Sequence, residues 1–188
     1  EDTLKIRAFI EQDQPKTAVV IGGGFIGLEM AENLTELGIK TTIIQRGNHL
    51  LPTVDADMAS LIHAIFRSRG VQLLLNSSAE KMSVTGDKVL LELTDGGQIS
   101  ADMAVISVGV VPENTLAKKA GLELGVKGAI KVNSKMETSV PDIYAVGDAV
   151  QVKHFITERD AVISLAGPAN KQGRIAADNI CGLDSEYK

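Results

Sequence analysis

The stretch from Val19 to Glu32, VVIGGGFIGLEMAE, constrains the fold of this chain more than any other segment. An apolar run from Ala18 to Ile21 predicts a buried strand, and an apolar pattern with helical period, LEMAENL, begins at Leu28. Between the two lie three glycines with G-x-G-x-x-G spacing: Gly22, Gly24 and Gly27. The pattern therefore predicts a strand, a tight turn and a helix in direct succession.

Such a turn is typical of a dinucleotide-binding site. The first glycine supplies unusual backbone angles, the second lets a pyrophosphate approach the main chain, and the third lets the helix pack closely on the strand. Unpaired N–H groups at the helix start, with the positive end of the helix dipole, then face the phosphates. From this turn we predict cofactor-binding residues Gly22, Gly24, Phe25, Ile26 and Gly27. The alternative is a glycine-rich turn with a purely steric role.

The surrounding pattern predicts an α/β fold, with a Rossmann-like parallel sheet and an inserted antiparallel β-meander. Expected helices are Leu4–Glu11, Phe25–Leu37 and a segment from Asp55 to about Arg69. Expected strands of the parallel sheet are Ala18–Ile21, Lys40–Gln45, Val71–Leu75 and Met103–Val108. The meander is expected over Ala79–Val84, Lys88–Leu93 and Gln98–Ile99.

Composition excludes several classes of function. The formal net charge of -5 and the absence of a basic run argue against nucleic acid as a partner. A single cysteine, Cys181, allows no internal disulfide and indicates a reducing, cytoplasmic compartment. No apolar stretch is long enough to span a bilayer, and the three histidines have no metal-ligand spacing, so we expect neither a membrane nor a metal partner. Because the chain begins with Glu1 and not with an initiator methionine, we expect it to be processed, truncated or excerpted from a longer protein.

A second motif occupies Thr138 to Ala149, TSVPDIYAVGDA. We expect a short strand over Ile143–Val146 that ends in Gly147 and Asp148, where a carboxylate can accept a hydrogen bond from a polyol. The arrangement resembles the second FAD motif of the pyridine nucleotide-disulfide oxidoreductase family. The resemblance implies that Gly147 and Asp148 bind the ribityl or adjoining phosphate region of FAD.

A third segment, Leu165 to Gly182, reads LAGPANKQGRIAADNICG and predicts a helix with Pro168 in its first turn. The sequence AGPANKQGR within this segment is most similar to the coenzyme A-disulfide reductase and NADH oxidase branch of that family. The resemblance implies that the helix N-terminus, including Ala169, points at the pyrimidine edge of the flavin. For Gln172 and Arg174 the alternative to a ligand role is an ordinary helix residue on a solvated face, and neither is selected as a ligand. Cys181 is predicted to be a buried structural cysteine.

The resemblance implies an NAD(P)-binding domain over residues 1–110 and an incomplete C-terminal segment of an FAD-binding domain over 111–188. The intact protein would then pass hydride from NAD(P)H to FAD, and on to a disulfide such as coenzyme A disulfide or to oxygen. Its redox-active cysteine would lie on a segment outside this chain, and the intact protein would form a homodimer. The alternative is a nucleotide-binding module without turnover, and we expect the chain alone to retain flavin weakly or not at all.

Two features of the sequence give opposite indications of whether the nucleotide is NADH or NADPH. Gly27 resembles the NAD-type loop, whereas the end of the second strand carries Gln45 and Arg46 in place of an acidic residue. Glutamine does not repel a 2′-phosphate, and arginine offers it a permanently charged, bidentate partner. The charge argument favours NADPH, or use of both nucleotides, with Gln45 and Arg46 as binding residues. The alternative for Arg46 is a solvated loop arginine.

Phe25 and two further residues, Glu29 and Gly109, resemble family positions near the nicotinamide or the flavin. Phe25 resembles an aromatic that lies over the flavin, although a core side chain at the strand–helix junction fits the sequence equally well. Glu29 resembles an acid on the first helix turn, where the helix dipole alone also favours a carboxylate. Gly109 resembles the small residue that closes the nucleotide domain against the flavin, and its alternative is a simple turn glycine.

Overall fold

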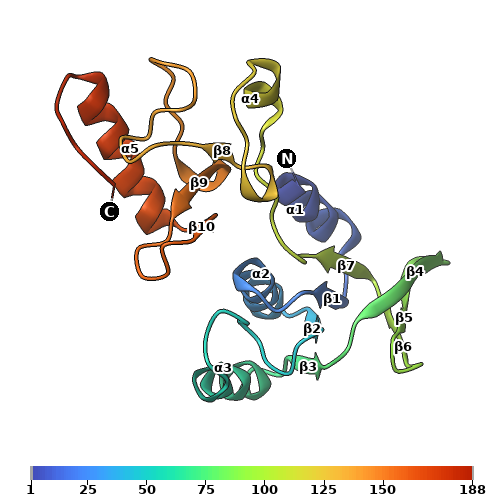
Figure 1. Cartoon of the computed structure of the whole chain (residues 1–188). Helices are drawn as coiled ribbons and strands as arrows, with labels where there is room; N and C mark the ends of the chain where they lie inside the picture. Colours follow the sequence, from blue (N-terminus) through green and yellow to red (C-terminus); the bar gives the residue numbers. More distant parts are fainter. Residues whose placement is uncertain (1, 188) are drawn as a thin grey trace. The chain divides into compact units, whose positions relative to one another are not determined.

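The computed structural model describes residues 2–187, which divide into two compact units on either side of the Gly109–Val110 bond (Figure 1). Each unit has its own sheet and its own hydrophobic core. In the described part of the chain, no helix is long and apolar enough to cross a membrane.

The first unit contains two sheets. A parallel sheet has the strand order β3-β2-β1-β7, and an antiparallel sheet has the order β4-β5-β6. Its elements are α1 (Asp2–Asp13), β1 (Thr17–Ile21), α2 (Phe25–Glu36), β2 (Lys40–Gln45), α3 (Ala56–Ser68), β3 (Gln72–Leu75), β4 (Ala79–Thr85), β5 (Lys88–Leu93), β6 (Gln98–Ala101) and β7 (Met103–Ile106). The predicted α/β fold with an inserted antiparallel meander is confirmed.

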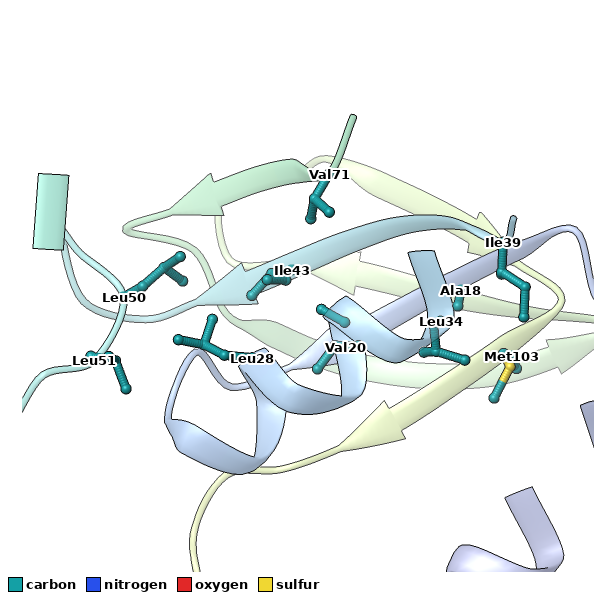
Figure 2. Close-up of a cluster of buried hydrophobic side chains, with 11 residues drawn as sticks. Ala18, Val20, Leu28, Leu34, Ile39, Ile43, Leu50, Leu51, Val71 and Met103 are labelled. Carbon is teal, nitrogen blue, oxygen red and sulfur yellow. The ribbon is translucent and has the colours of Figure 1, made fainter. Parts of the chain in front are cut away.

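Successive strand residues point to opposite faces of the parallel sheet. Both faces are buried, because another layer packs against each of them. On one face, Val20 and Ile43 pack against Leu28 and Leu34 of α2 (Figure 2). On the other face, Val19 and its neighbours pack against residues of the antiparallel sheet. The first unit therefore has three layers: helices, the parallel sheet and the antiparallel sheet.

The carboxylate of Asp102, between β6 and β7, contacts both the start of β1 and Lys88 of β5. Asp102 accepts hydrogen bonds from the N–H groups of Lys16 and Thr17 at 2.9 and 2.8 Å, and from the Thr17 hydroxyl at 2.8 Å. It also forms an ion pair with Lys88 at 3.1 Å. Together these contacts hold the pKa of Asp102 well below its usual range.

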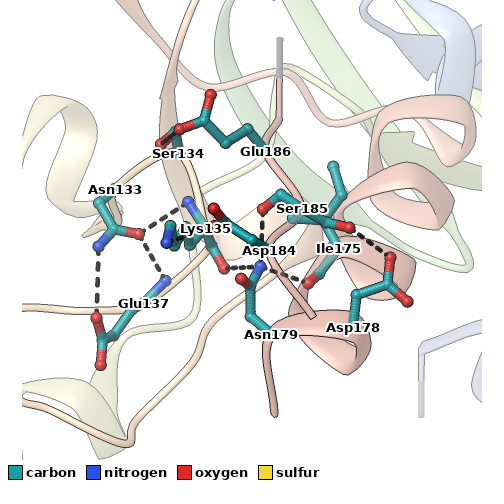
Figure 3. Close-up of polar contacts among 10 residues, drawn as sticks. All are labelled: Asn133, Ser134, Lys135, Glu137, Ile175, Asp178, Asn179, Asp184, Ser185 and Glu186. Atoms are coloured by element: carbon teal, nitrogen blue, oxygen red, sulfur yellow. Dashed lines mark hydrogen bonds and ion pairs between the residues drawn. The ribbon is translucent and has the colours of Figure 1, made fainter. Parts of the chain in front are cut away.

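The second unit is built around a three-stranded sheet of order β10-β9-β8 and one long helix. Its elements are α4 (Thr115–Lys119), η1 (Val126–Gly128), β8 (Ile130–Lys131), η2 (Gly147–Ala149), β9 (Val150–Lys153), β10 (Asp160–Ala161) and α5 (Ala166–Ile180). The core joins Val150 and Val152 of β9 to Ile175 and Ala176 of α5. Asn179 anchors the end of α5 by donating to the carbonyls of Lys135, Ile175 and Ser185 (Figure 3).

The predicted strand over Ile143–Val146 is wrong. That segment makes a single isolated bridge, between Tyr144 and Glu137, and a turn at Gly147–Ala149 separates it from β9. The apolar run that pairs on both sides is Val150–Lys153, next to β8 and β10. Ile143 and Val146 are about two-fifths exposed, so they lack the burial that a core strand requires.

Candidate functional site

The glycine turn between β1 and α2 has the geometry that its spacing predicts. Gly22 has a φ of +109°, a conformation that side-chain-bearing residues rarely adopt, and its N–H donates to the carbonyl of Ile44 at 2.8 Å. A Cβ on Gly27 would overlap the carbonyl oxygen of Gly22, so only glycine fits this close approach without a shift of the turn. Ser107 braces the same turn by donating from Oγ to the carbonyls of Ile21 and Gly22 at 3.0 and 3.1 Å.

Gly24 has a different environment from its two partner glycines. It is the N-cap residue of α2, makes no side-chain cap hydrogen bond, and has open space within 4 Å of where a Cβ would be. The first N–H groups of a helix have no partner inside the helix, so an uncapped start is suited to an anion. The open approach to Gly24 and the helix start fit a pyrophosphate.

A cavity of about 510 Å³ lies at the carboxyl ends of the parallel strands. Its lining comes from the ends of β1 and β2 and from the segments after β3 and β7: Ile21, Gly22, Gly23, Gly24, Ile44, Gln45, Arg46, Pro52, Ser77, Ser78, Ala79, Ser107, Val108 and Gly109. This edge is where open α/β sheets bind their ligands. The structure thus brings the predicted residues Gly22, Gly24, Gln45, Arg46 and Gly109 to one cavity.

Gln45 and Arg46 differ in what their side chains contact. The Oε1 atom of Gln45 accepts a hydrogen bond from the N–H of Gly23 at 2.9 Å, so this side chain braces the glycine turn. Arg46 is exposed at the cavity, and no hydrogen bond or ion pair joins its guanidinium to another residue between 2 and 187. The bracing by Gln45 depends on a contact 22 positions away in the chain, which no local pattern reveals.

The other predicted residues of this unit lie outside the cavity lining. Phe25 and Ile26 are 52% and 51% exposed at the start of α2, and Glu29 is exposed one turn further on. The alternative of Phe25 as a core side chain is therefore wrong. Gly109, by contrast, has a φ of +141° and lines the cavity after β7.

The segment between β2 and α3 is held by a histidine that sequence reasoning left without a role. The N–H of Leu50 donates to Nε2 of His63 at 3.0 Å, which requires that nitrogen to be unprotonated. Burial, with smaller contributions from Arg67 and His49, lowers the pKa of His63 below its usual value of 6.5. This contact positions the segment that carries Arg46 and Pro52.

In the second unit, Gly147 and Asp148 lie in a short turn against α5. Gly147 has a φ of +82°, and its N–H donates to Oε1 of Gln172 at 2.7 Å. A Cβ on Gly147 would be 3.9 Å from that of Ala169, so the turn lies close to the first turn of the helix. Asp148 is exposed beside it.

In α5 the structure excludes the solvated-face alternative for Gln172, and the prediction for Cys181 is wrong. Gln172 is 1% exposed rather than on a solvated face, because its amide is needed to accept the Gly147 hydrogen bond. Cys181 is exposed rather than buried, because it follows the last residue of α5 as the C-cap. In the part of the chain that the structure describes, no group of three His, Cys, Asp or Glu side chains could hold a metal ion.

The sequence of this chain is similar to those of known proteins of one family. The sequence profile of the pyridine nucleotide-disulphide oxidoreductases matches residues 4–173. The NADH oxidase of Methanocaldococcus jannaschii is 38% identical over 188 residues, which are 100% of this chain and 42% of that protein. The coenzyme A disulfide reductase of Staphylococcus aureus is 34% identical over 189 residues, again 100% of this chain and 42% of the relative. This chain therefore spans about two-fifths of the length of these curated relatives.

Solved structures of related oxidoreductases have the same fold as this chain. The crystal structure of reduced Bacillus anthracis CoADR-RHD has a TM-score of 0.92 and 47% identity, covering 100% of this chain and 33% of that one. A water-forming NADPH oxidase engineered from the Lactobacillus brevis NADH oxidase and bound to NADPH has a TM-score of 0.87 and 29% identity, covering 100% of this chain and 42% of the other. On the profile match and these relatives, the chain belongs to the pyridine nucleotide-disulphide oxidoreductase family.

Proposed function

We propose that the cavity of the first unit binds NAD(P)H, with its pyrophosphate on the N-terminus of α2. The observation that carries this proposal is the uncapped helix start at Gly24, which adjoins the cavity and has open space on the side where a Cβ would be. Gly22 and Gly27 form the turn, Ser107 and Gln45 brace it, and Arg46 supplies a positive charge at the edge of the second strand.

We further propose that the whole protein is an oxidoreductase, in line with its family of NAD(P)-binding flavoproteins. FAD, when bound, would supply the acceptor for hydride from NAD(P)H, and the proposed final acceptor is a disulfide such as coenzyme A disulfide, or oxygen. In this chain Gly147, Asp148 and Ala169 are the proposed flavin contacts, because the turn at Gly147 presents an exposed carboxylate beside the first turn of α5. A homodimer in the cytoplasm is part of the same proposal.

The proposed nucleotide is NADPH, or both NADPH and NADH. The engineered NADPH oxidase differs from its parent at a glycine, an aspartate, an alanine, a methionine and a proline, with successive separations of 18, 1, 1 and 5 positions. This chain has the same separations among Gly27, Gln45, Arg46, Gly47 and Pro52. Like the engineered enzyme, it has an arginine after a non-acidic residue, and like the parent it keeps the glycine and the proline.

Calorimetric titration of the chain with NADPH and NADH tests the proposal. We expect Arg46→Ala to weaken NADPH binding about 10- to 100-fold, the usual range for one charge-assisted hydrogen bond, and to change NADH binding by less than about threefold. Lys40→Ala is the matched control, since Lys40 is an exposed cation at the opposite end of β2. Equal affinities of the parent and Arg46→Ala for both nucleotides would refute the role of Arg46. No heat from either nucleotide at millimolar concentration would refute the nucleotide site itself.

A second candidate function, a nucleotide-binding module without turnover, is favoured by the division of the described residues. All lining residues of the cavity belong to the first unit, so this unit by itself forms the cavity proposed to bind the nucleotide. An assay of NADPH oxidation by the intact protein, with added FAD and coenzyme A disulfide, distinguishes the two candidates: a bound nucleotide that is never oxidised indicates the module.

A further inference from the structure

Gly23, in the middle of the glycine turn, is held by groups that lie outside the turn. Its N–H donates to Oε1 of Gln45 at 2.9 Å, and its carbonyl accepts from the N–H of Leu51 at 2.7 Å. The side chain of Leu50 packs against it, since a Cβ on Gly23 would lie 2.5 Å from Cδ2 of Leu50. The end of β2 and the segment that follows it therefore fix the position of Gly23.

These contacts fix the orientation of two successive peptide groups. A peptide group is planar and trans, so its carbonyl and its N–H point in opposite directions. The first of the two groups links Gly22 to Gly23. Gln45 accepts from its N–H, and the hydroxyl of Ser107 donates to its carbonyl at 3.1 Å. This peptide group is thus held at both of its polar ends.

The second peptide group links Gly23 to Gly24 and is held at one end. Leu51 donates to its carbonyl, whereas its N–H, which belongs to Gly24, makes no hydrogen bond to another residue in the described part of the chain. This N–H points away from Leu51, and Gly24 lines the cavity. It is therefore a donor whose direction is set before a ligand arrives, which lowers the cost of binding an anion.

The acceptor on Gln45 comes from a firmly held position. Gln45 pairs with Leu75 of β3, and its own carbonyl accepts from the N–H of Ser77 at 3.1 Å. Gly23 is buried, so loss of the glutamine oxygen would leave its N–H without an acceptor and away from water. The turn would then adopt other orientations, in which the N–H of Gly24 is aimed elsewhere.

We propose that Gln45 is a positioning residue for the pyrophosphate of NAD(P)H, an inference that rests on the proposed function of the cavity. Gln45 acts through the peptide group between Gly22 and Gly23 and so keeps the N–H of Gly24 directed at the phosphates. This role depends on the oxygen of the glutamine amide. It is independent of the 2′-phosphate, so NADH and NADPH depend on Gln45 equally.

The test is titration of the 188-residue chain and its variants with NADH, NADPH and inorganic pyrophosphate, the last as a competitor of NADH. Gln45→Met removes the acceptor and is expected to weaken all three ligands alike by about five- to tenfold, the usual effect of one hydrogen bond. Gln45→Glu keeps an acceptor for Gly23 and is expected to bind NADH within about threefold of the parent. Gln98→Met, at an exposed glutamine of β6, is the matched control.

Hydrogen exchange of the Gly23 amide, measured without ligand, reports on the contact itself. We expect it to accelerate in Gln45→Met and to keep the parent rate in Gln45→Glu and Gln98→Met. Should Gln45→Met fold poorly, Gln45→Asn keeps the amide but is one methylene too short to reach Gly23, and the same comparisons apply.

Unchanged exchange at Gly23, or unchanged pyrophosphate affinity, in Gln45→Met overturns the inference and leaves the proposed function intact. A loss that is confined to the nucleotides and spares pyrophosphate also overturns it, since this result indicates direct contact of Gln45 with a ribose. If the parent binds neither nucleotide, or if pyrophosphate does not displace NADH from it, the proposed function fails first.

Discussion

Gly22 and Gly24 belong to one turn, but glycine is required at each for a different reason. Gly22 has a φ of +109°, and a Cβ there would overlap the carbonyl oxygen of Ser107. Gly24 has a negative φ of -81° and open space around it, so nothing in the protein itself excludes a side chain. At the first position glycine serves the fold, and at the second we infer that it serves the ligand.

This difference predicts separable effects of two alanine substitutions. Gly22→Ala is expected to destabilise the protein by about 1–3 kcal/mol, the usual cost of a strained backbone conformation. Gly24→Ala is expected to change stability by less than about 0.5 kcal/mol, as surface substitutions do, yet to weaken NADPH at least about tenfold by obstructing the pyrophosphate. Urea unfolding followed by circular dichroism and calorimetry with NADPH check both. A Gly24→Ala variant that binds normally contradicts the proposed approach of the phosphates.

At the scale of single elements, the segment after β2 and the turn before β9 are each held by one side chain from a helix. His63 of α3 accepts from Leu50, and Gln172 of α5 accepts from Gly147. Both contacts join a loop at a candidate site to a helix that packs in the core of the same unit. Loss of either hydrogen bond is therefore expected to disturb the loop that it holds, although neither His63 nor Gln172 is proposed to contact a ligand.

The His63 contact predicts a pH dependence. Because the pKa of His63 is lowered in the folded state, its contribution to stability is fully present above its unfolded value of 6.5. It is lost as the pH falls below 6.5 and through the folded pKa, because the protonated ring cannot accept from Leu50. We expect NADPH affinity and unfolding free energy to decline together below pH 6.5. In His63→Gln, whose side chain offers a non-titrating acceptor, this decline should be smaller; an identical profile would assign the dependence to other groups.

Removal of the Gln172 amide leaves the N–H of Gly147 without its acceptor. We expect Gln172→Ala to destabilise the second unit by about 1–3 kcal/mol, the usual penalty for an unsatisfied buried group. Both tyrosines, Tyr144 and Tyr187, belong to this unit, so tyrosine fluorescence during urea unfolding reports on it. Asn170→Ala, an exposed neighbour on α5, serves as control. Faster hydrogen exchange at the Gly147 amide in Gln172→Ala alone would support the assignment, and equal exchange would contradict it.

At the scale of the whole molecule, the two proposed cofactor sites differ in how much of each the chain contains. The nucleotide cavity is lined from the ends of β1 and β2 and from the segments after β3 and β7, all in one unit. The proposed flavin contacts are confined to one turn and one helix start in the other unit, and the chain spans 42% of its curated relatives. A ligand as large as FAD needs most of its surface covered for tight binding.

We therefore expect the purified chain to bind NADPH but to lose added FAD on gel filtration. An absorption spectrum of the eluted protein is the measurement, with free FAD run through the same column as the control. A yellow protein peak with bound flavin would show that the second unit holds more of the flavin site than Gly147, Asp148 and Ala169.

The local pattern of the sequence is sufficient to predict the glycine turn, the strands beside it and the family. The spacing of Gly22, Gly24 and Gly27 is a property of a few consecutive residues, and the period of apolar residues separates helices from strands. The pattern is insufficient at Ile143–Val146, an apolar run that lies just before the true strand beginning at Val150. The spacing of apolar residues does not show which of two neighbouring apolar segments will pair with a strand on each side.

Residue chemistry and order along the chain were enough to determine that a nucleotide-binding edge is expected in this protein and which glycines form its turn. Only the tertiary structure decided that Gln45 braces Gly23, that Gln172 is buried against Gly147, that Cys181 is exposed, and that the Ser77 hydroxyl is buried without a partner among the described residues. The physical reason is that a hydrogen bond or a buried position depends on which distant segments meet in space, and packing makes that choice over the whole unit at once.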